Sequence, residues 1–180
     1  MKGRLIYIVG PSGAGKDSVI DYARVRLPAN SNVVFARRTI TRPAAAGGEH
    51  HEAVTPDAFD SRLAQGGFAM YWRANGLAYG IGREILDWLE SGRTVVVSGS
   101  RAHLPEAMAV FPALEAVHVS APLETLKRRL QTRGREDAAQ VARRIERAEK
   151  LHIPAGTQAF EVRNDGELSS AGENLLAFIT

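Results

Sequence analysis

The sequence contains no cysteine, which excludes disulfide bonds and thiolate chemistry and agrees with a reducing cytoplasm. It also contains no apolar run near the roughly 20 residues that a membrane-spanning helix needs. The opening residues, MKGRLIYIVG, lead directly into a glycine-rich loop, without the cleavage pattern of a signal peptide. We therefore expect a cytoplasmic protein with no membrane partner.

Aromatic residues make up only 7% of the chain and do not interleave with arginine as stacking platforms for single-stranded nucleic acid do. The chain is nevertheless basic, with a formal charge of +3 and a pI near 9.5. Its arginines concentrate near residues 37–42 and 128–147, and small phosphates attract the same charge. We expect a small-molecule substrate and no nucleic acid. Salt-sensitive retention of DNA would favour the alternative, a nucleic-acid enzyme or NTPase switch.

What is present is the composition of one globular domain, with 44% apolar and 24% charged residues in 180. Apolar runs at Leu5–Val9, Thr94–Val97 and Ala116–Ser120 alternate with helical stretches. This alternation predicts an α/β fold of three layers, a central parallel sheet with helices on both faces.

The expected division of the single domain is a core of residues 1–37, 91–131 and 152–180, an insert of about 38–90 and a lid of about 132–151. In the first half of the chain we also expect a helix from Lys16 ended by Pro28, a strand at Val33–Ala36 and short helices at 56–65 and 82–90. A helix after Pro122 should break near Arg133-Gly134 and resume over about 137–151. The last expected elements are a strand at about 159–163 and a helix at 168–179. The glycines and prolines of the insert suggest a segment that closes over a ligand.

The segment GPSGAGKDS carries the clearest motif. Its spacing G-x-x-x-x-G-K, from Gly10 to Lys16, lies between an apolar strand and a helix, where backbone N–H groups converge on phosphate. Lys16 would add a point charge at the β- and γ-phosphates, so the motif predicts ATP with Mg²⁺. The expected nucleotide-binding residues are Gly10, Pro11, Ser12, Gly13, Ala14, Gly15, Lys16, Asp17 and Ser18.

Asp17 stands where the motif requires serine or threonine. It could ligate the magnesium ion or hold one of its waters, because Mg²⁺ prefers oxygen ligands. Two alternatives stay open: Ser18 supplies the hydroxyl, or Asp17 only complements the helix dipole. No carboxylate follows the strand Thr94–Val97, so our hypothesis is that Asp17 replaces part of that missing charge.

Beyond the loop, the chain resembles the guanylate kinase-like branch of the nucleoside monophosphate kinases. The matching residues are GPSGAGK, Thr39–Pro43, Gly48-Glu49, Gly67-Phe68, Gly76, Tyr79-Gly80, Arg129-Leu130, Arg133-Gly134, Arg144 and Asn164-Asp165, in order over almost the whole chain. The resemblance implies that Asn164 lines the adenine pocket. We expect Arg133 and Arg144 to stabilise the transition state, with Arg129 on the same helical face as Arg133 and Arg143 as the alternative to Arg144.

The guanine-reading part of that family is missing. Its Gly-Glu-Phe-x-Glu-Trp stretch corresponds to Gly66–Trp72, which has neither glutamate. Ser98 and Ser100, which we expect to bind the substrate, replace acidic residues near the third strand. A lost acceptor for a buried base N–H costs about 1–3 kcal/mol, so GMP is disfavoured. The phosphate-handling part is present as Arg38, Arg42, His51 near a family tyrosine, and Tyr79, while one further family arginine is Ala45.

The segments GPSGAGKDS, ITR, ANGLAYG and SGSRAHLP are similar to those of the ribose 1,5-bisphosphate phosphokinases of bacterial phosphonate metabolism, the PhnN family. The resemblance implies that ATP phosphorylates α-D-ribose 1,5-bisphosphate to 5-phospho-α-D-ribosyl 1-diphosphate, with ADP as the second product. A phosphate acceptor is already largely a dianion at pH 7 and needs no general base. Rival interpretations are a divergent guanylate kinase, another sugar-phosphate kinase and a non-catalytic module that binds phosphopeptides. The oligomeric state stays open, a homodimer included.

Overall fold

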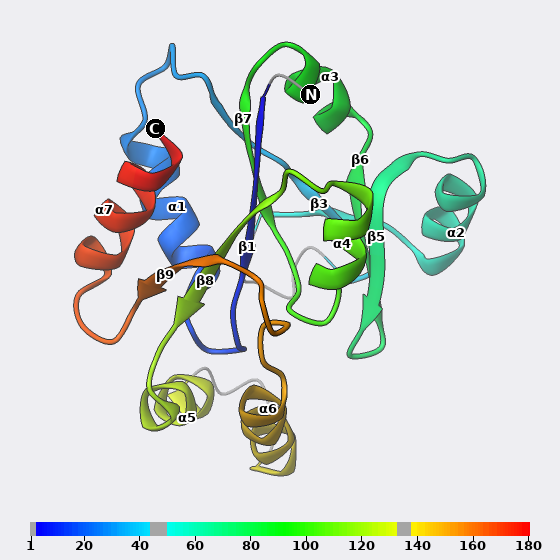
Figure 1. Ribbon diagram of the computed structural model, residues 1–180. Helices are drawn as coiled ribbons and strands as arrows, with labels where there is room; N and C mark the ends of the chain where they lie inside the picture. The colour runs from blue at the N-terminus through cyan, green and yellow to red at the C-terminus, as the bar shows by residue number, and fades with distance from the viewer. Residues whose placement is uncertain (1–2, 44–49, 133–137) are drawn as a thin grey trace.

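The computed structural model describes residues 3–43, 50–132 and 138–180 (Figure 1). Its main sheet has five parallel strands in the order β2-β7-β1-β8-β9. These strands are β1 (Arg4–Val9), β2 (Val33–Phe35), β7 (Thr94–Ser98), β8 (Glu115–Ser120) and β9 (Ala159–Arg163). Helices cover both faces, so the predicted three-layer α/β fold is confirmed.

The central strand β1 shows why both faces are covered. Successive side chains of a strand point to opposite faces, and every residue from Leu5 to Val9 is buried. Ile6 and Ile8 pack with α1 (Lys16–Arg26) and α7 (Leu168–Ile179). Leu5, Tyr7 and Val9 pack on the other face, with α3 (Glu84–Glu90) and α4 (Leu104–Val110).

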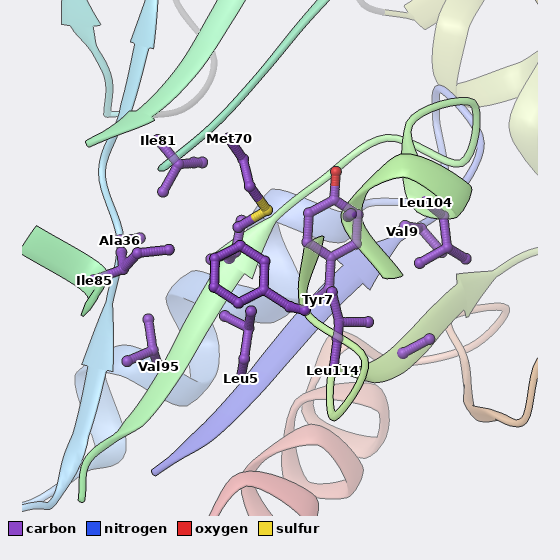
Figure 2. Packing of buried hydrophobic residues seen from close by; sticks show 14 of the residues in the cluster. Leu5, Tyr7, Val9, Ala36, Met70, Ile81, Ile85, Val95, Leu104 and Leu114 are labelled. Atoms are coloured by element: carbon purple, nitrogen blue, oxygen red, sulfur yellow. The ribbon is translucent and has the colours of Figure 1, made fainter. Parts of the chain in front are cut away.

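A second sheet shares this latter core. Figure 2 shows Met70 and Ile81 in one buried cluster with Leu5 and Tyr7, and both come from a four-stranded sheet of order β4-β3-β6-β5. Its strands are β3 (Arg38–Ile40), β4 (Glu52–Ala53), β5 (Phe68–Ala74) and β6 (Leu77–Gly82), and α2 (Pro56–Ala64) lies between β4 and β5 in the chain. The helices α2 and α3 were expected from the sequence, but this sheet, whose shortest strands have three and two residues, was not.

The carboxyl ends of the main strands point toward α5 (Leu123–Thr132) and α6 (Ala138–Lys150), which lie side by side at the bottom of Figure 1. Parallel α/β sheets bind ligands outside the carboxyl ends of their strands. Both helices were expected, and the expected break near Arg133-Gly134 lies outside the described residues.

No helix in the described part of the chain is long and apolar enough to cross a bilayer.

Candidate active site

A cavity of about 540 Å³ lies at the carboxyl ends of the main strands. The glycine-rich loop, the turn after β7, the β5–β6 hairpin and α6 all contribute to its lining. Among the described lining residues, six are cationic and two are carboxylates. The cations are Lys16, Arg38, Arg42, Arg101, Arg144 and Arg147, and the carboxylates are Asp17 and Asp21. Such an excess of positive charge around one cavity favours an anionic ligand.

The loop between β1 and α1 has the geometry of a phosphate cradle. Gly15 precedes α1 in the left-handed conformation, with φ 79° and ψ 23°. A Cβ atom at Gly15 would lie 2.4 Å from Nδ2 of Asn164. Both the positive φ and the close approach to Asn164 require glycine at this position. Directly after Gly15, the N-terminus of α1 lies at the cavity.

Asn164 supports this loop from beneath. Its side chain is only 3% exposed, and its Nδ2 donates to the carbonyl oxygen of Ala14 at 2.7 Å. Arg129 donates to the same oxygen at 3.4 Å. Neither Asn164 nor Arg129 lines the cavity. Both residues therefore contact the backbone of the loop at Ala14.

Lys16 and Asp17 are joined through Ser98 at the end of β7. Lys16 Nζ donates to Ser98 Oγ at 2.6 Å and to Asp17 Oδ1 at 3.0 Å, and Ser98 Oγ donates to Asp17 Oδ1 at 3.2 Å. Arg38 approaches the same Oδ1 to 3.7 Å from β3. Ser98, at the end of the strand where no carboxylate is present, is therefore hydrogen-bonded to Asp17, the carboxylate of the loop.

The Asp17 carboxyl is ionised at neutral pH. Burial alone would raise its pKa, but the charges of Lys16 and Arg38 and the hydrogen bonds from Lys16 and Ser98 lower that pKa to about 2. Within the described ranges no three His, Cys, Asp or Glu side chains cluster as metal ligands. Mg²⁺ needs no such cage, because it binds through one or two protein oxygens together with phosphates and water. Asp17 and the exposed Ser18, which also lines the cavity, fit that requirement.

Arg38 and Arg42 enter the cavity from the second sheet. His51 is buried, 6% exposed, and does not line the cavity. Its Nε2 lies 3.0 Å from the carbonyl oxygen of Arg42, and its Nδ1 lies 3.4 Å from the Arg42 guanidinium. The ring therefore donates through Nε2 and accepts at Nδ1, which holds Arg42 at both ends. The neighbouring His50 is exposed, as expected for adjacent histidines on an extended segment.

An aromatic stack forms one wall. The Trp72 ring stacks with two other rings. Its centroid lies 5.4 Å from that of Tyr79, with an interplanar angle of 2°, and 5.0 Å from that of His103, with an interplanar angle of 23°. Arg38 lies 5.6 Å from the Tyr79 ring centroid. Trp72 and Tyr79 line the cavity, so Trp72 contributes to the site as well as to packing.

Tyr7 fixes the turn that follows β7. Its hydroxyl accepts from the backbone N–H of Ser100 at 3.2 Å and is hydrogen-bonded to Nδ1 of His103 at 2.9 Å. Burial lowers the pKa of His103, in agreement with a neutral ring. Gly99 can approach Tyr7 this closely because it has no side chain: a Cβ atom there would lie 2.1 Å from the Tyr7 ring. Ser100 and Arg101 are thus presented to the cavity from a rigid base.

The helix α6 contributes Arg144 and Arg147, while Arg143 is exposed and outside the lining. Arg133 lies outside the described residues. Arg101 and Arg147 are site residues that were not expected from the sequence. Arg101 is 8% exposed and donates to the carbonyl oxygens of Ala148 and Leu151, and Arg147 donates to Asn75 in the β5–β6 turn. Arg147 belongs to the arginine-rich stretch of residues 128–147, whereas Arg101 lies outside both arginine-rich stretches of the sequence.

Comparison with known proteins agrees with this geometry. The family model described as AAA domain matches residues 6–152. Relatives named ribose 1,5-bisphosphate phosphokinase PhnN from Thiobacillus denitrificans, Chromobacterium violaceum and Desulfomicrobium baculatum are 49%, 50% and 47% identical over 99%, 98% and 98% of this chain and 94% of each relative. The chain belongs to the PhnN family of AAA-domain proteins. The resemblance deduced from the sequence motifs is confirmed.

Solved structures add the fold of this PhnN family member. A guanylate kinase from Anaplasma phagocytophilum superimposes with a TM-score of 0.72 at 17% identity, over 98% of this chain and 84% of that one. A sugar kinase from Janibacter has a TM-score of 0.53 at 14% identity, over 97% and 93% of the two chains. At such identities the likeness concerns the fold alone. A P-loop kinase fold implies ATP binding, typically with magnesium.

Proposed function

We propose that the protein transfers the γ-phosphoryl group of ATP to the 1-phosphate of α-D-ribose 1,5-bisphosphate, forming 5-phospho-α-D-ribose 1-diphosphate and ADP. Membership of the PhnN family supports this reaction. The observation that carries the proposal is the cavity in which six cations face two carboxylates. Both donor and acceptor are multiply charged phosphates, so a kinase for this pair must cancel charge on both. We propose that the enzyme acts in the cytoplasm.

On the donor side, the loop from Gly10 to Ser18 would hold the phosphates of ATP. Its residues and the N-terminal residues of α1 line the cavity, where Lys16 supplies a positive charge and backbone N–H groups could bind phosphate. Asp17, with Ser18 as the neighbouring hydroxyl, would hold Mg²⁺. When bound, magnesium neutralises charge on the β- and γ-phosphates. Asn164 and Arg129 keep the loop in shape through Ala14.

On the acceptor side, Arg38, Arg42, Tyr79 and Ser100 would bind the ribose bisphosphate. An oxygen of its 1-phosphate attacks the γ-phosphorus, and the bond from that phosphorus to the β,γ-bridging oxygen breaks, leaving ADP. Because the phosphate oxygen is already largely deprotonated at pH 7, the site needs no general base. His51 and the Trp72 stack act through Arg42 and Tyr79, which they position.

The described acceptor side offers no carboxylate to the N–H groups of a purine. The two carboxylates among the described lining residues are both on α1, and the second sheet contributes none. Guanine N–H donors buried there would lose their acceptors. This distribution favours an acceptor that consists of sugar and phosphate.

We further propose that residues 38–90 form the acceptor-binding insert and that residues 132–151 close over the ligands as a lid. Arg144, with Arg133 and Arg129, would then stabilise the charge on the transferred phosphoryl group. Closure would exclude water and so limit hydrolysis of ATP.

The test is a phosphorus NMR time course with magnesium ATP and either ribose 1,5-bisphosphate or GMP. We expect a new diphosphate signal alongside ADP when ribose 1,5-bisphosphate is the acceptor and no such signal when GMP is the acceptor. The Lys16→Met variant should give no reaction with either acceptor. Product from GMP alone would make the protein a divergent guanylate kinase. No product from either acceptor would overturn the proposal and favour another phosphorylated metabolite.

A further inference from the structure

The turn between β5 and β6 is built around Asn75. Asn75 has φ 52° and Gly76 has φ 74°, the two consecutive positive values that a tight hairpin turn requires. Asparagine tolerates this conformation better than most residues. The turn forms part of the cavity wall, because Ala74, Asn75 and Leu77 all line it.

Arg147 reaches this turn from α6. Its guanidinium donates to Oδ1 of Asn75, across 72 positions of the sequence. Arg147 lies one helical turn beyond Arg144, and both side chains line the cavity. The bond therefore joins two elements that both line the cavity, the hairpin and α6.

The chemistry of the pair matters for charge. An amide oxygen is neutral, so Asn75 orients the guanidinium without cancelling its positive charge. A guanidinium has five N–H donors, and one bond to Asn75 leaves the capacity for two parallel bonds to a phosphate. A carboxylate at position 75 would hold Arg147 as well but would compete with the phosphate for its charge.

The surroundings of Arg147 reinforce this argument. Arg101 is buried nearby, and its pKa is lowered first by that burial and then by the charge of Arg147. Arg38 and Arg42 enter the same cavity from the hairpin's own sheet. Arginines brought together in this way repel one another until an anion lies between them, so their convergence indicates a phosphate-binding position.

We propose that Asn75 is a positioning residue that holds Arg147 against a phosphate of the acceptor, so that the hairpin and α6 bind the acceptor jointly. The inference rests on the proposed function and names a further residue pair for the same site. Arg147 would bind the acceptor and not ATP, because Asn75, its hydrogen-bond partner, belongs to the sheet that supplies Arg38 and Arg42.

The experiment compares Asn75→Gly, Asn75→Asp, Arg147→Met and the double variant Asn75→Gly/Arg147→Met. Glycine keeps the backbone conformation and removes the amide, whereas aspartate keeps the acceptor oxygen and adds charge. We expect Asn75→Gly and Arg147→Met each to raise the KM for ribose 1,5-bisphosphate by roughly tenfold, the effect of losing one well-oriented charged contact. The KM for ATP and the melting temperature should stay nearly unchanged.

Two further results are expected if the pair acts as one unit. The double variant should be no worse than Arg147→Met alone, because Asn75 has nothing left to position. Asn75→Asp should also raise the acceptor KM, since its charge competes with phosphate. Lys150→Met, which removes an exposed cation of the same helix that does not line the cavity, is the control and should leave the acceptor KM unchanged.

An unchanged acceptor KM in Asn75→Gly, additive effects in the double variant, or a change confined to the KM for ATP would overturn the inference. Failure of the proposed function is seen separately, as absence of product with the wild type. In that case calorimetric titration of ribose 1,5-bisphosphate into the ADP-saturated protein still tests the pair, with weaker binding by Asn75→Gly expected and equal binding contradicting it.

Discussion

The side-chain amide of Asn164 donates to the carbonyl oxygen of Ala14 at 2.7 Å, so a residue after β9 supports the phosphate loop after β1. Asn164→Ala would leave this buried carbonyl with Arg129 at 3.4 Å as its remaining described side-chain donor. We expect the free energy of unfolding to fall by about 1–3 kcal/mol and ATP to bind more weakly. Denaturant unfolding and titration with ATP measure the two effects.

The matched control for that substitution is Asn32→Ala. Asn32 is exposed, and its Nδ2 donates to the carbonyl oxygen of Gly92 at 3.0 Å, far from the cavity. It should lose less stability because water can replace an exposed partner, and it should bind ATP as the wild type does. Equal losses in the two variants would show that Asn164 has no special role in the loop.

A second prediction concerns Asp17 and magnesium. Asp17→Asn keeps the shape of the side chain but removes the anionic oxygen beside Lys16 and Ser98. The magnesium concentration for half-maximal activity should rise, by roughly tenfold if Asp17 contributes one charged contact to the ion or its waters. Asp21→Asn, one helical turn further along α1, should change that concentration less. An unchanged requirement in Asp17→Asn would leave Ser18 as the residue that serves the metal.

The lowered pKa of Asp17 also makes a prediction about acid stability. A carboxyl whose pKa falls from 3.8 to about 2 on folding stabilises the protein above its unfolded pKa, and this contribution is lost as the pH falls through that range. The wild type minus Asp17→Asn difference in unfolding free energy should be constant near neutral pH and shrink below about pH 4. Its size should be modest, because the carboxylate is 44% exposed and solvent screens its charge.

Urea unfolding of both proteins at a series of pH values measures this difference. Pairing Asp21→Asn with the wild type in the same series separates Asp17 from the general effect of one lost acid on α1. A difference that stays constant or grows toward acid pH would contradict the assigned ion pairs.

The main sheet was predictable because its strands are buried on both faces. Such strands appear in a sequence as continuous apolar runs, and Leu5–Val9 and Thr94–Val97 were located to within one residue. The second sheet was missed because β3 and β4 are short and contain Arg38, Thr39 and Glu52, whose pairing depends on distant residues. One local signal was available: Asn75-Gly76 between alternating apolar residues is typical of a hairpin.

The site divides in the same way. The loop from Gly10 to Lys16 is local, so its spacing alone locates it. Arg101 and Arg147 have partners 47 to 72 positions away, and two of these are backbone carbonyls that any residue could supply. No pattern in the sequence identifies such contacts. They become visible once α6 is placed against the turn after β7.

Arg101 provides the last prediction. Its buried guanidinium donates to the carbonyl oxygens of Ala148 and Leu151 at the C-terminal end of α6, where a positive charge is also favoured by the helix dipole. Arg101→Met keeps the apolar stem and removes both bonds. Because hydrogen bonds from charged donors contribute about 1.5–3 kcal/mol each, we expect α6 to open locally and its amides to exchange with deuterium at least tenfold faster.

Arg143→Met removes an exposed arginine from α6 and should leave exchange unchanged. The activity of Arg101→Met should fall as well, since α6 carries Arg144 and Arg147. Wild-type exchange in α6 of Arg101→Met would instead mean that other contacts hold the helix against the core.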